Sequence, residues 1–224
     1  MSGMAREYGQ FCGLARALEL VGGRWTLLIV RDLFAGPRRF TELQEGLPGI
    51  ATNMLSSRLR ELEEEGIVER RLLARPSNSV VYALTPFGLA LEEPLVALGL
   101  WGLGALGPPK ETDCFNASSF ALALRGAFRP EVAQNRDLRF EIRLGEFRLH
   151  LVIERGRLFF PTEASETPDV VLQTTPDALA ELLAGELDLK SAIAAGRLEL
   201  EGRRRAAPLF FEIFSLSSHL QVAP

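Results

Sequence analysis

Hydrogen-bonding side chains are concentrated between residues 52 and 60, where they alternate with leucines at helical spacing. Hydroxyl, amide and guanidinium groups of this kind form hydrogen bonds with base edges and with phosphate oxygens. A helix that carries them on one side predicts contact with DNA. The residues expected to make these contacts are Thr52, Asn53, Ser56, Ser57, Arg58 and Arg60.

The leucines of the same segment indicate which side of the helix is buried. Leu55, Leu59 and Leu62 fall at i, i+4 and i+7, on one narrow stripe, so the polar residues project from the opposite side. Three glutamates at 63–65 crowd the C-terminal end, where they oppose the helix dipole and repel phosphate. The N-terminal half is therefore predicted to enter the major groove. Gly66 is predicted to end the helix.

A two-stranded ribbon is predicted directly after this helix. Strand-forming apolar residues occupy 67–73 and 80–84, on either side of a polar turn that cannot be buried. Two residues of that turn, Arg75 and Asn78, are expected to touch DNA. A helix followed by a ribbon with a basic tip predicts a winged helix-turn-helix.

Two arginines precede another short predicted helix. Thr41 and Gln44 have the spacing of a capping box, so the helix is expected to begin close to them. Arg38 and Arg39 lie just ahead of it, where they are placed to hold phosphate together with the N-terminal amides of the helix.

The segment from Phe11 to about Gly102 resembles the HxlR family of bacterial transcriptional regulators. The residues that carry the resemblance include Gly22-Gly23-Arg24-Trp25-Thr26, Gly36-Pro37-Arg38-Arg39-Phe40, Leu47-Pro48-Gly49-Ile50, Arg58-Leu59-Arg60-Glu61-Leu62 and Leu84-Thr85-Pro86. Ala51 departs from the family, which often has serine as the helix cap there, so Thr52 or Asn53 is expected to cap instead. The resemblance implies a homodimer that pairs through terminal helices and binds double-stranded DNA.

Cys12 is the one candidate for a reactive group. It precedes the first predicted helix, where the helix dipole and Arg16 favour a thiolate. Several members of the resembled family use a cysteine at this point to sense oxidants. The favoured interpretation is a small buried residue without redox chemistry, because members of the family without a redox role carry this cysteine too. Cys114 is expected to be inert, although pairing with Cys12 of a second copy stays open.

A long apolar helix offers a surface for the dimer. Thr85 and Pro86 form a cap and first-turn pair for a helix that is expected to run to about Leu106, with a kink at Pro94. Leucines, a valine and a tryptophan make this helix apolar nearly all round. A small winged domain cannot bury so much apolar surface alone, so a partner subunit is expected to cover it.

Composition and charge set the broad class. Hydrophobic residues make up 47% of the 224, and no apolar run reaches the ~20 residues of a membrane span, so a cytoplasmic protein is expected. Residues 1–110 hold 12 basic and 12 acidic side chains, and residues 111–224 hold 13 and 17, so the acidic excess lies in the second half.

His150 and His219 have no metal-ligand spacing to a cysteine, and no catalytic motif occurs. No enzymatic activity, metal or cofactor is expected.

The second half of the chain follows a different pattern. The polar stretch 108–114 is the expected linker between a domain at 1–107 and one at 115–224. Apolar residues then alternate with charged ones over 138–144 and 147–153, around a Gly145-Glu146 turn, which predicts a β-hairpin. Strands at 158–160 and 170–172 are expected to extend it to an antiparallel sheet, followed by helices, a strand at 197–201 and a last helix. The fold class is α+β.

Residues 115–218 resemble the sterol-carrier-protein type of lipid-binding domain. Pro168-Asp169-Val170-Val171-Leu172 and Ala194-Ala195-Gly196-Arg197-Leu198 are among the segments that carry this resemblance. It implies an apolar tunnel for a lipid-like molecule, whereas the pattern alone fits an ordinary core equally well. The residues expected to line a tunnel are Phe128, Phe140, Phe147, Leu149, Phe160, Phe210 and Phe214.

These observations lead to one main hypothesis and one rival. The main hypothesis is a dimeric, sequence-specific transcriptional regulator whose second domain binds an apolar effector. The rival is a lipid carrier or scaffold in which the winged domain serves only for dimerisation.

Overall fold

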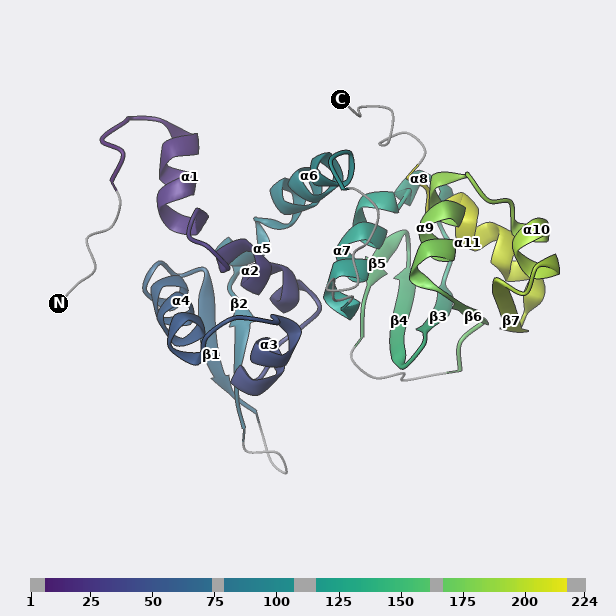
Figure 1. The fold of residues 1–224 in the computed structure, drawn as a ribbon, viewed down its shortest axis with the longest axis horizontal. Coiled ribbons are helices and arrows are strands. Elements are labelled where there is room, and N and C mark those ends of the chain that lie inside the picture. Colours follow the sequence, from purple (N-terminus) through teal and green to yellow (C-terminus); the bar gives the residue numbers. More distant parts are fainter. Residues whose placement is uncertain (1–6, 74–78, 107–115, 162–166, 217–224) are drawn as a thin grey trace. The chain divides into compact units, whose positions relative to one another are not determined.

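The structure is a computed structural model that describes residues 7–73, 79–106, 116–161 and 167–216 (Figure 1). It divides into two compact units, Met1–Leu95 and Val96–Pro224. The division falls inside helix α6 (Glu92–Leu103). The linker predicted at 108–114 lies outside the described residues, so that boundary stays a prediction.

The first unit is a winged helix-turn-helix, as predicted. Four helices precede a two-stranded antiparallel ribbon, in which Val68 pairs with Leu84 and Leu72 with Val80. Figure 1 shows α2, α3 and α4 gathered beside this ribbon. The elements are α1 (Gly13–Val21), α2 (Thr26–Phe34), α3 (Phe40–Gly46), α4 (Thr52–Glu64), β1 (Val68–Leu72), β2 (Val80–Leu84) and α5 (Pro86–Leu89).

The apolar segment after β2 forms two helices, so the single kinked helix predicted over 86–106 is wrong. Thr85 caps α5 as expected, because its hydroxyl accepts a hydrogen bond from the Gly88 backbone N–H at 3.1 Å. The helix stops at Leu89, and α6 begins at Glu92. Pro94 therefore lies in the first turn of α6. Backbone N–H groups in a first turn have no acceptor within the helix, so a proline there costs no hydrogen bond and causes no kink.

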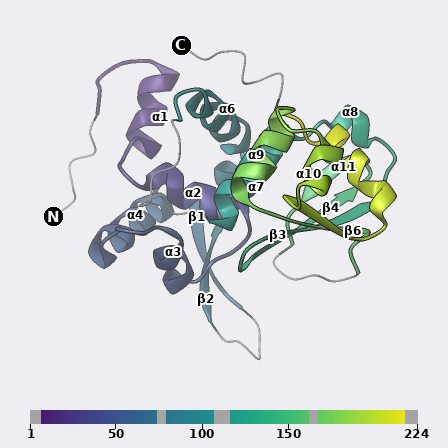
Figure 2. The ribbon, with the colours of Figure 1, turned by 45° about the vertical axis from the view of Figure 1, so that its right-hand side comes forward.

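The second unit packs helices onto one face of a five-stranded sheet (Figure 2). Asn116 begins its first helix, because its side-chain oxygen accepts from the Ser119 backbone N–H at 2.7 Å. The elements are α7 (Ala117–Ala127), α8 (Pro130–Ala133), β3 (Leu138–Leu144), β4 (Phe147–Glu154), β5 (Arg157–Phe159), β6 (Val170–Thr174), α9 (Pro176–Ala184), α10 (Leu189–Ala194), β7 (Leu198–Gly202), the 3₁₀ turn η1 (Arg204–Ala206) and α11 (Ala207–Ile213).

The sheet has the order β5-β4-β3-β6-β7, and one of its pairs differs from the prediction. The hairpin is confirmed, since Leu144 pairs with Phe147 across the predicted turn. However, β6 pairs with β3 in the parallel direction, so the sheet is mixed and not purely antiparallel. The physical reason is the position of β6, which joins the sheet beside β3 and not beside β5, the strand that precedes it in sequence.

Part of α6 is covered within its own chain. Leu100 and Leu103 pack against the core of the second unit. A Cβ atom built at Gly126 of α7 would lie 2.9 Å from Cδ2 of Leu100, so the Leu100 side chain packs closely against the α7 backbone there. The expectation that a partner subunit must cover the whole apolar helix is therefore too broad. Leu98 and Trp101 stay exposed.

Candidate nucleic-acid interface

Helix α4 separates its apolar and polar residues onto opposite faces. Leu55, Leu59 and Leu62 are 0–1% exposed and form part of the core of the first unit. Thr52, Asn53, Ser56 and Arg60 are exposed. Gly66 has a positive φ of 69° just after the helix, which is the left-handed conformation that ends many helices. Helix α4 is therefore anchored in the core by its leucines and exposes these polar side chains to solvent.

The start of α4 is open to a ligand. Its N-cap is Ala51, which forms no side-chain cap, so the predicted capping by Thr52 or Asn53 is wrong. The Thr52 hydroxyl instead accepts a hydrogen bond from Nε2 of Gln44 in α3 at 2.8 Å, and the Ser56 hydroxyl donates to the Thr52 carbonyl at 2.9 Å. Because no side chain caps the first turn, its N–H groups are available to a phosphate.

Ser57 and Arg58 are held within the protein. The Ser57 hydroxyl donates to Oε1 of Glu61 at 3.0 Å, and Nη1 of Arg58 donates to the other carboxylate oxygen. The Arg58 side chain is only 25% exposed, and a Cβ atom built at Gly23 would lie 3.0 Å from its Nη1. The guanidinium therefore lies against the turn between α1 and α2. These contacts reduce what either residue can offer to DNA.

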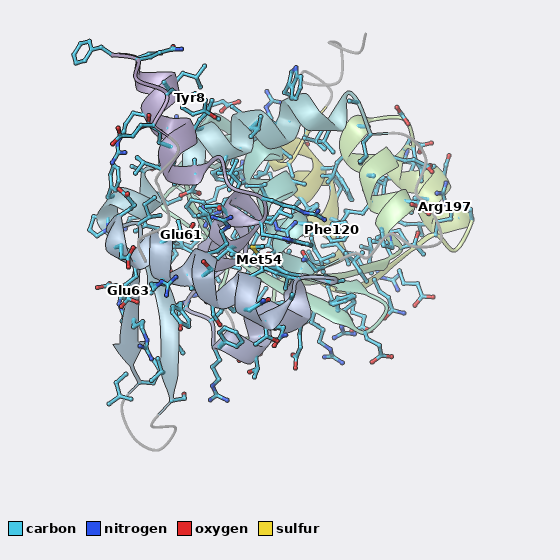
Figure 3. All side chains as sticks on the ribbon, turned by 60° about the vertical axis from the view of Figure 1, so that its left-hand side comes forward. Tyr8, Met54, Glu61, Glu63, Phe120 and Arg197 are labelled. Carbon is cyan, nitrogen blue, oxygen red and sulfur yellow. The ribbon has the colours of Figure 1, made fainter. Side chains whose placement is uncertain are left out.

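Met54 is an exposed residue that the sequence pattern did not single out. It is 37% exposed in the first turn of α4, and Figure 3 labels it together with Glu61 and Glu63 of the same helix. Its thioether is a soft apolar group among hydroxyls and an amide. An apolar group at this place can contact the methyl group of thymine. The sequence does contain a signal for this residue, because Met54 is an apolar residue at a position of the helix where the leucine pattern predicts a polar one.

The backbone at Arg38 joins α3 to the ribbon. The Arg38 N–H donates to the Tyr82 carbonyl at 2.9 Å, and the Tyr82 N–H donates back at 2.7 Å. Arg39 is exposed at the start of α3, and its N–H donates to Oε2 of Glu42 at 2.7 Å. The predicted capping box at Thr41 and Gln44 is therefore wrong, because the N-cap is Arg39, two residues earlier, and the Glu42 side chain accepts from its N–H.

The described part of the ribbon carries two arginines. Arg71 forms an ion pair with Glu69. Arg70 is exposed, and its guanidinium carbon lies 5.9 Å from the ring centre of Tyr82. Arg75 and Asn78, the predicted contacts at the tip, lie outside the described residues.

Cys12 is exposed, immediately before α1. The favoured interpretation, a small buried residue, is therefore wrong for the chain as described. Cys114 and His219 lie outside the described residues. Within the described ranges, no group of three or more histidine, cysteine or carboxylate side chains is placed to hold a metal ion.

Aromatic rings fill the centre of the second unit. Phe140, Phe210 and Phe214 are 0–1% exposed, and their ring centres lie 4.7–5.1 Å apart where they meet. Phe128 adds a fourth ring at 5.6 Å from Phe214. Of the other residues proposed to line a tunnel, Leu149 is buried, Phe160 packs partly buried against the core, and Phe147 is 46% exposed. An acyl chain among these rings would have to displace them.

Two known protein families match this chain, one in each half. The model of the HxlR-like helix-turn-helix family matches residues 20–109. The HTH-type transcriptional regulator YodB of Bacillus subtilis is 42% identical over 98 residues, which are 44% of this chain and 87% of YodB. The chain belongs to the HxlR-like helix-turn-helix family. Through its HxlR-like part, the protein is a transcriptional regulator of this family.

A second family matches the other half of this HxlR-like chain. The model of the SCP-2 sterol transfer family covers residues 127–214, which confirms the second resemblance. Among solved structures, the reduced form of YodB from B. subtilis is 37% identical and covers 45% of this chain and all of its own, with a TM-score of 0.39. A sec-alkyl sulfatase, PisA1, matches 45% of this chain at 21% identity and a TM-score of 0.40. This chain spans only 16% of that sulfatase, so the match carries no argument about activity.

Among the helices of the described ranges, none is both long and apolar enough to cross a bilayer.

Proposed function

We propose that this protein is a sequence-specific DNA-binding regulator that acts as a homodimer. The observation that carries the proposal is the polar face of α4, on which Asn53, Ser56 and Arg60 are exposed while the leucines behind them are fully buried. The amide of Asn53 and the hydroxyl of Ser56 can form hydrogen bonds with base edges. The guanidinium of Arg60 can form them with guanine or with a phosphate. The N-terminal half of α4 enters the major groove in this proposal.

The contacts divide into two classes. Arg39 and Arg60 bind phosphates or base edges from exposed positions, and the uncapped first turn of α4 adds backbone N–H groups. Asn53, Met54 and Ser56 contact bases. Arg38 and the predicted tip residues Arg75 and Asn78 bind the backbone on either side of the groove. Ser57 and Arg58 contribute chiefly by holding α4 in place, because Glu61 engages both.

Helix α1 is the proposed dimer surface in the first unit. Leu14 and Leu18 are 68% and 45% exposed, and they lie at i and i+4 on one stripe of the helix. Phe11, just before the helix, is also exposed. A folded protein that leaves a leucine stripe and a phenylalanine in water commonly covers them with a partner. Two-fold symmetry then presents two copies of α4 to a palindromic site.

DNA binding is tested by fluorescence anisotropy with the DNA upstream of the protein's own gene and with a scrambled duplex. The intact protein is expected to prefer the upstream DNA. Asn53→Ala is expected to reduce that preference by about 1–3 kcal/mol, the value of one good base contact. Arg39→Ala is expected to weaken binding to both duplexes and to lower the salt slope by about one.

A matched control distinguishes local contacts from overall charge. Arg136→Ala removes the same charge from an exposed position in the second unit, so it is expected to leave both affinities close to those of the intact protein. Equal affinity of the intact protein for the two duplexes at low salt contradicts sequence-specific binding. Absence of binding to either duplex at low salt favours the rival, in which the winged domain serves only for dimerisation.

The dimer is tested by analytical ultracentrifugation. Leu14→Glu with Leu18→Glu is expected to give monomers, since four carboxylates would meet at a two-fold contact. Ile193→Glu, at a 44% exposed position of α10, is the matched control and is expected to keep the dimer. Unchanged mass in the α1 variant moves the contact elsewhere.

An apolar effector in the second unit is the remaining part of the proposal, and the match to the SCP-2 family supports it. The rings of Phe140, Phe210 and Phe214 weigh against a tunnel that is already open, so the ligand must enter by displacing side chains. Mass spectrometry of an organic extract of the purified protein is expected to find a stoichiometric acyl compound. Its absence, together with no change of melting temperature on adding long-chain fatty acid, contradicts effector binding of this type.

The redox role of Cys12 is tested by comparing DNA affinity before and after diamide treatment, with Cys12→Ser as the control.

A further inference from the structure

The junction between β7 and α11 forms an open hollow on the surface, beside a run of three arginines. It has a volume of about 620 Å³ and is lined by five consecutive residues, 202–206, three of which are arginines. The surrounding half of the chain carries an acidic excess, so this local reversal of sign is not a consequence of composition. Three cations close together on the surface attract a small ligand of the opposite sign.

Two of the three arginines have no counter-charge of their own. Nη1 of Arg203 lies 3.1 Å from Oδ1 of Asp169, so this residue is already paired. Arg204 and Arg205 are exposed, and within the described residues neither forms an ion pair or a side-chain hydrogen bond. The neighbouring carboxylate of Glu201 is bound to Arg143 at 3.0 Å. The carboxylates of Asp169 and Glu201 are therefore engaged, and the guanidinium groups of Arg204 and Arg205 remain available.

The backbone that carries these arginines is fixed. Gly202 has a φ of 81°, and a Cβ atom there would lie 2.8 Å from the Asp169 carbonyl oxygen, so a glycine is needed. The Arg203 N–H donates to that same oxygen at 2.7 Å, and the Ala206 N–H donates to the Arg203 carbonyl at 2.7 Å. Immediately afterwards Ala207 is fully buried. The hollow is thus anchored to the sheet at one end and to the core at the other.

We propose that this hollow binds a phosphate group. A guanidinium presents parallel N–H donors that match two oxygens of a phosphate, and two adjacent guanidinium groups suit a dianion better than a monoanion. A terminal phosphate, on a free metabolite or on a lipid headgroup, presents the oxygens that such a pair of guanidinium groups binds. The site is independent of the DNA-binding proposal, because none of its residues belongs to the first unit.

The test is calorimetry on the full-length protein with inorganic phosphate at constant ionic strength, together with flotation of phosphatidylcholine vesicles with and without phosphatidic acid. The intact protein is expected to bind at least one of these phosphate probes saturably. Arg204→Gln with Arg205→Gln is expected to weaken that binding at least about tenfold, since each residue contributes charged hydrogen bonds. Arg136→Gln with Arg157→Gln removes the same charge from exposed positions of the same unit and is expected to leave it unchanged. A melting curve of each variant verifies folding.

Each outcome decides the proposal. Arginine-dependent binding of inorganic phosphate supports the site with a soluble ligand, and dependence seen only with phosphatidic acid supports it with a lipid headgroup. No saturable binding of either probe overturns the proposal, and so does equal weakening in both double variants. Loss of DNA affinity in Arg204→Gln with Arg205→Gln, without any effect on phosphate, also overturns it and assigns these arginines to nucleic acid.

Discussion

Truncating Leu59 in the middle of α4 is expected to destabilise the first unit strongly without removing any DNA contact. Leu59 is 1% exposed, between two equally buried leucines, so the change leaves a cavity against a fixed core. Alanine keeps the helix propensity, and the loss is therefore one of packing. Leu→Ala at such sites costs about 3 kcal/mol, within a range of about 2–5. In a unit of this size each kcal/mol lowers Tm by about 4–8 °C, so a loss of about 3 kcal/mol in Leu59→Ala is expected to lower it by about 12–24 °C.

The assay needs a signal from the first unit alone. The chain has two tryptophans, Trp25 in the first unit and Trp101 in the second, so a Trp101→Phe background reports unfolding of the first unit by fluorescence. Arg60→Ala, one residue from Leu59, is the matched control. Its side chain is exposed, so it is expected to change stability by less than about 0.5 kcal/mol while weakening DNA binding.

The two variants are therefore expected to have opposite effects. Leu59→Ala should lower Tm and, where it is folded, keep its DNA affinity, whereas Arg60→Ala should lower the affinity and keep Tm. Equal Tm values for the two variants would refute the assignment of the leucine face to the interior. Equal loss of DNA affinity at a temperature where both are folded would refute the assignment of the polar face to DNA.

Three further changes test other parts of the structure. Gly88→Ala places a Cβ atom 2.1 Å from the carbonyl oxygen of Ile67, so it is expected to destabilise the first unit, as measured by urea unfolding. Phe210→Ala empties the centre of the second unit and is expected to cost about 3–5 kcal/mol, as measured by calorimetric melting. The pKa of Asp188 is lowered by its hydrogen bonds with Ser191, so its stabilising effect is present above the ordinary aspartate value of 3.8. That effect is lost as the pH falls through the lowered pKa, so Tm of the intact protein and of Asp188→Ala should converge at acid pH.

The recognition helix and the hairpin were predictable because their patterns are local. Leu55, Leu59 and Leu62 repeat at the helical period and all three are buried. The alternation over 138–153 fixes which face of the hairpin is apolar, and the Gly145-Glu146 turn fixes its register. In such segments the periodicity is itself the cause of the structure.

Other features depend on contacts that no local pattern contains. The parallel pairing of β6 with β3 depends on where a distant strand joins the sheet, and the sequence between them does not specify it. Helix α7 was missed because its leucines and alanines have no strong polar face, although Asn116 is an N-cap that could have indicated its start. The engagement of Ser57 and Arg58 by Glu61, in contrast, follows from i+4 and i+3 spacing and could have been predicted.

Photo-crosslinking from α4 tests the central claim most directly. A photoreactive benzoylphenylalanine in place of Asn53 places the probe in the first turn, and the same residue in place of Glu64 places it at the exposed C-terminal end of the same helix. Illumination with upstream DNA is expected to give a covalent DNA adduct from position 53 and little or none from position 64. Equal adducts from both positions, or adducts from position 64 alone, would contradict the account.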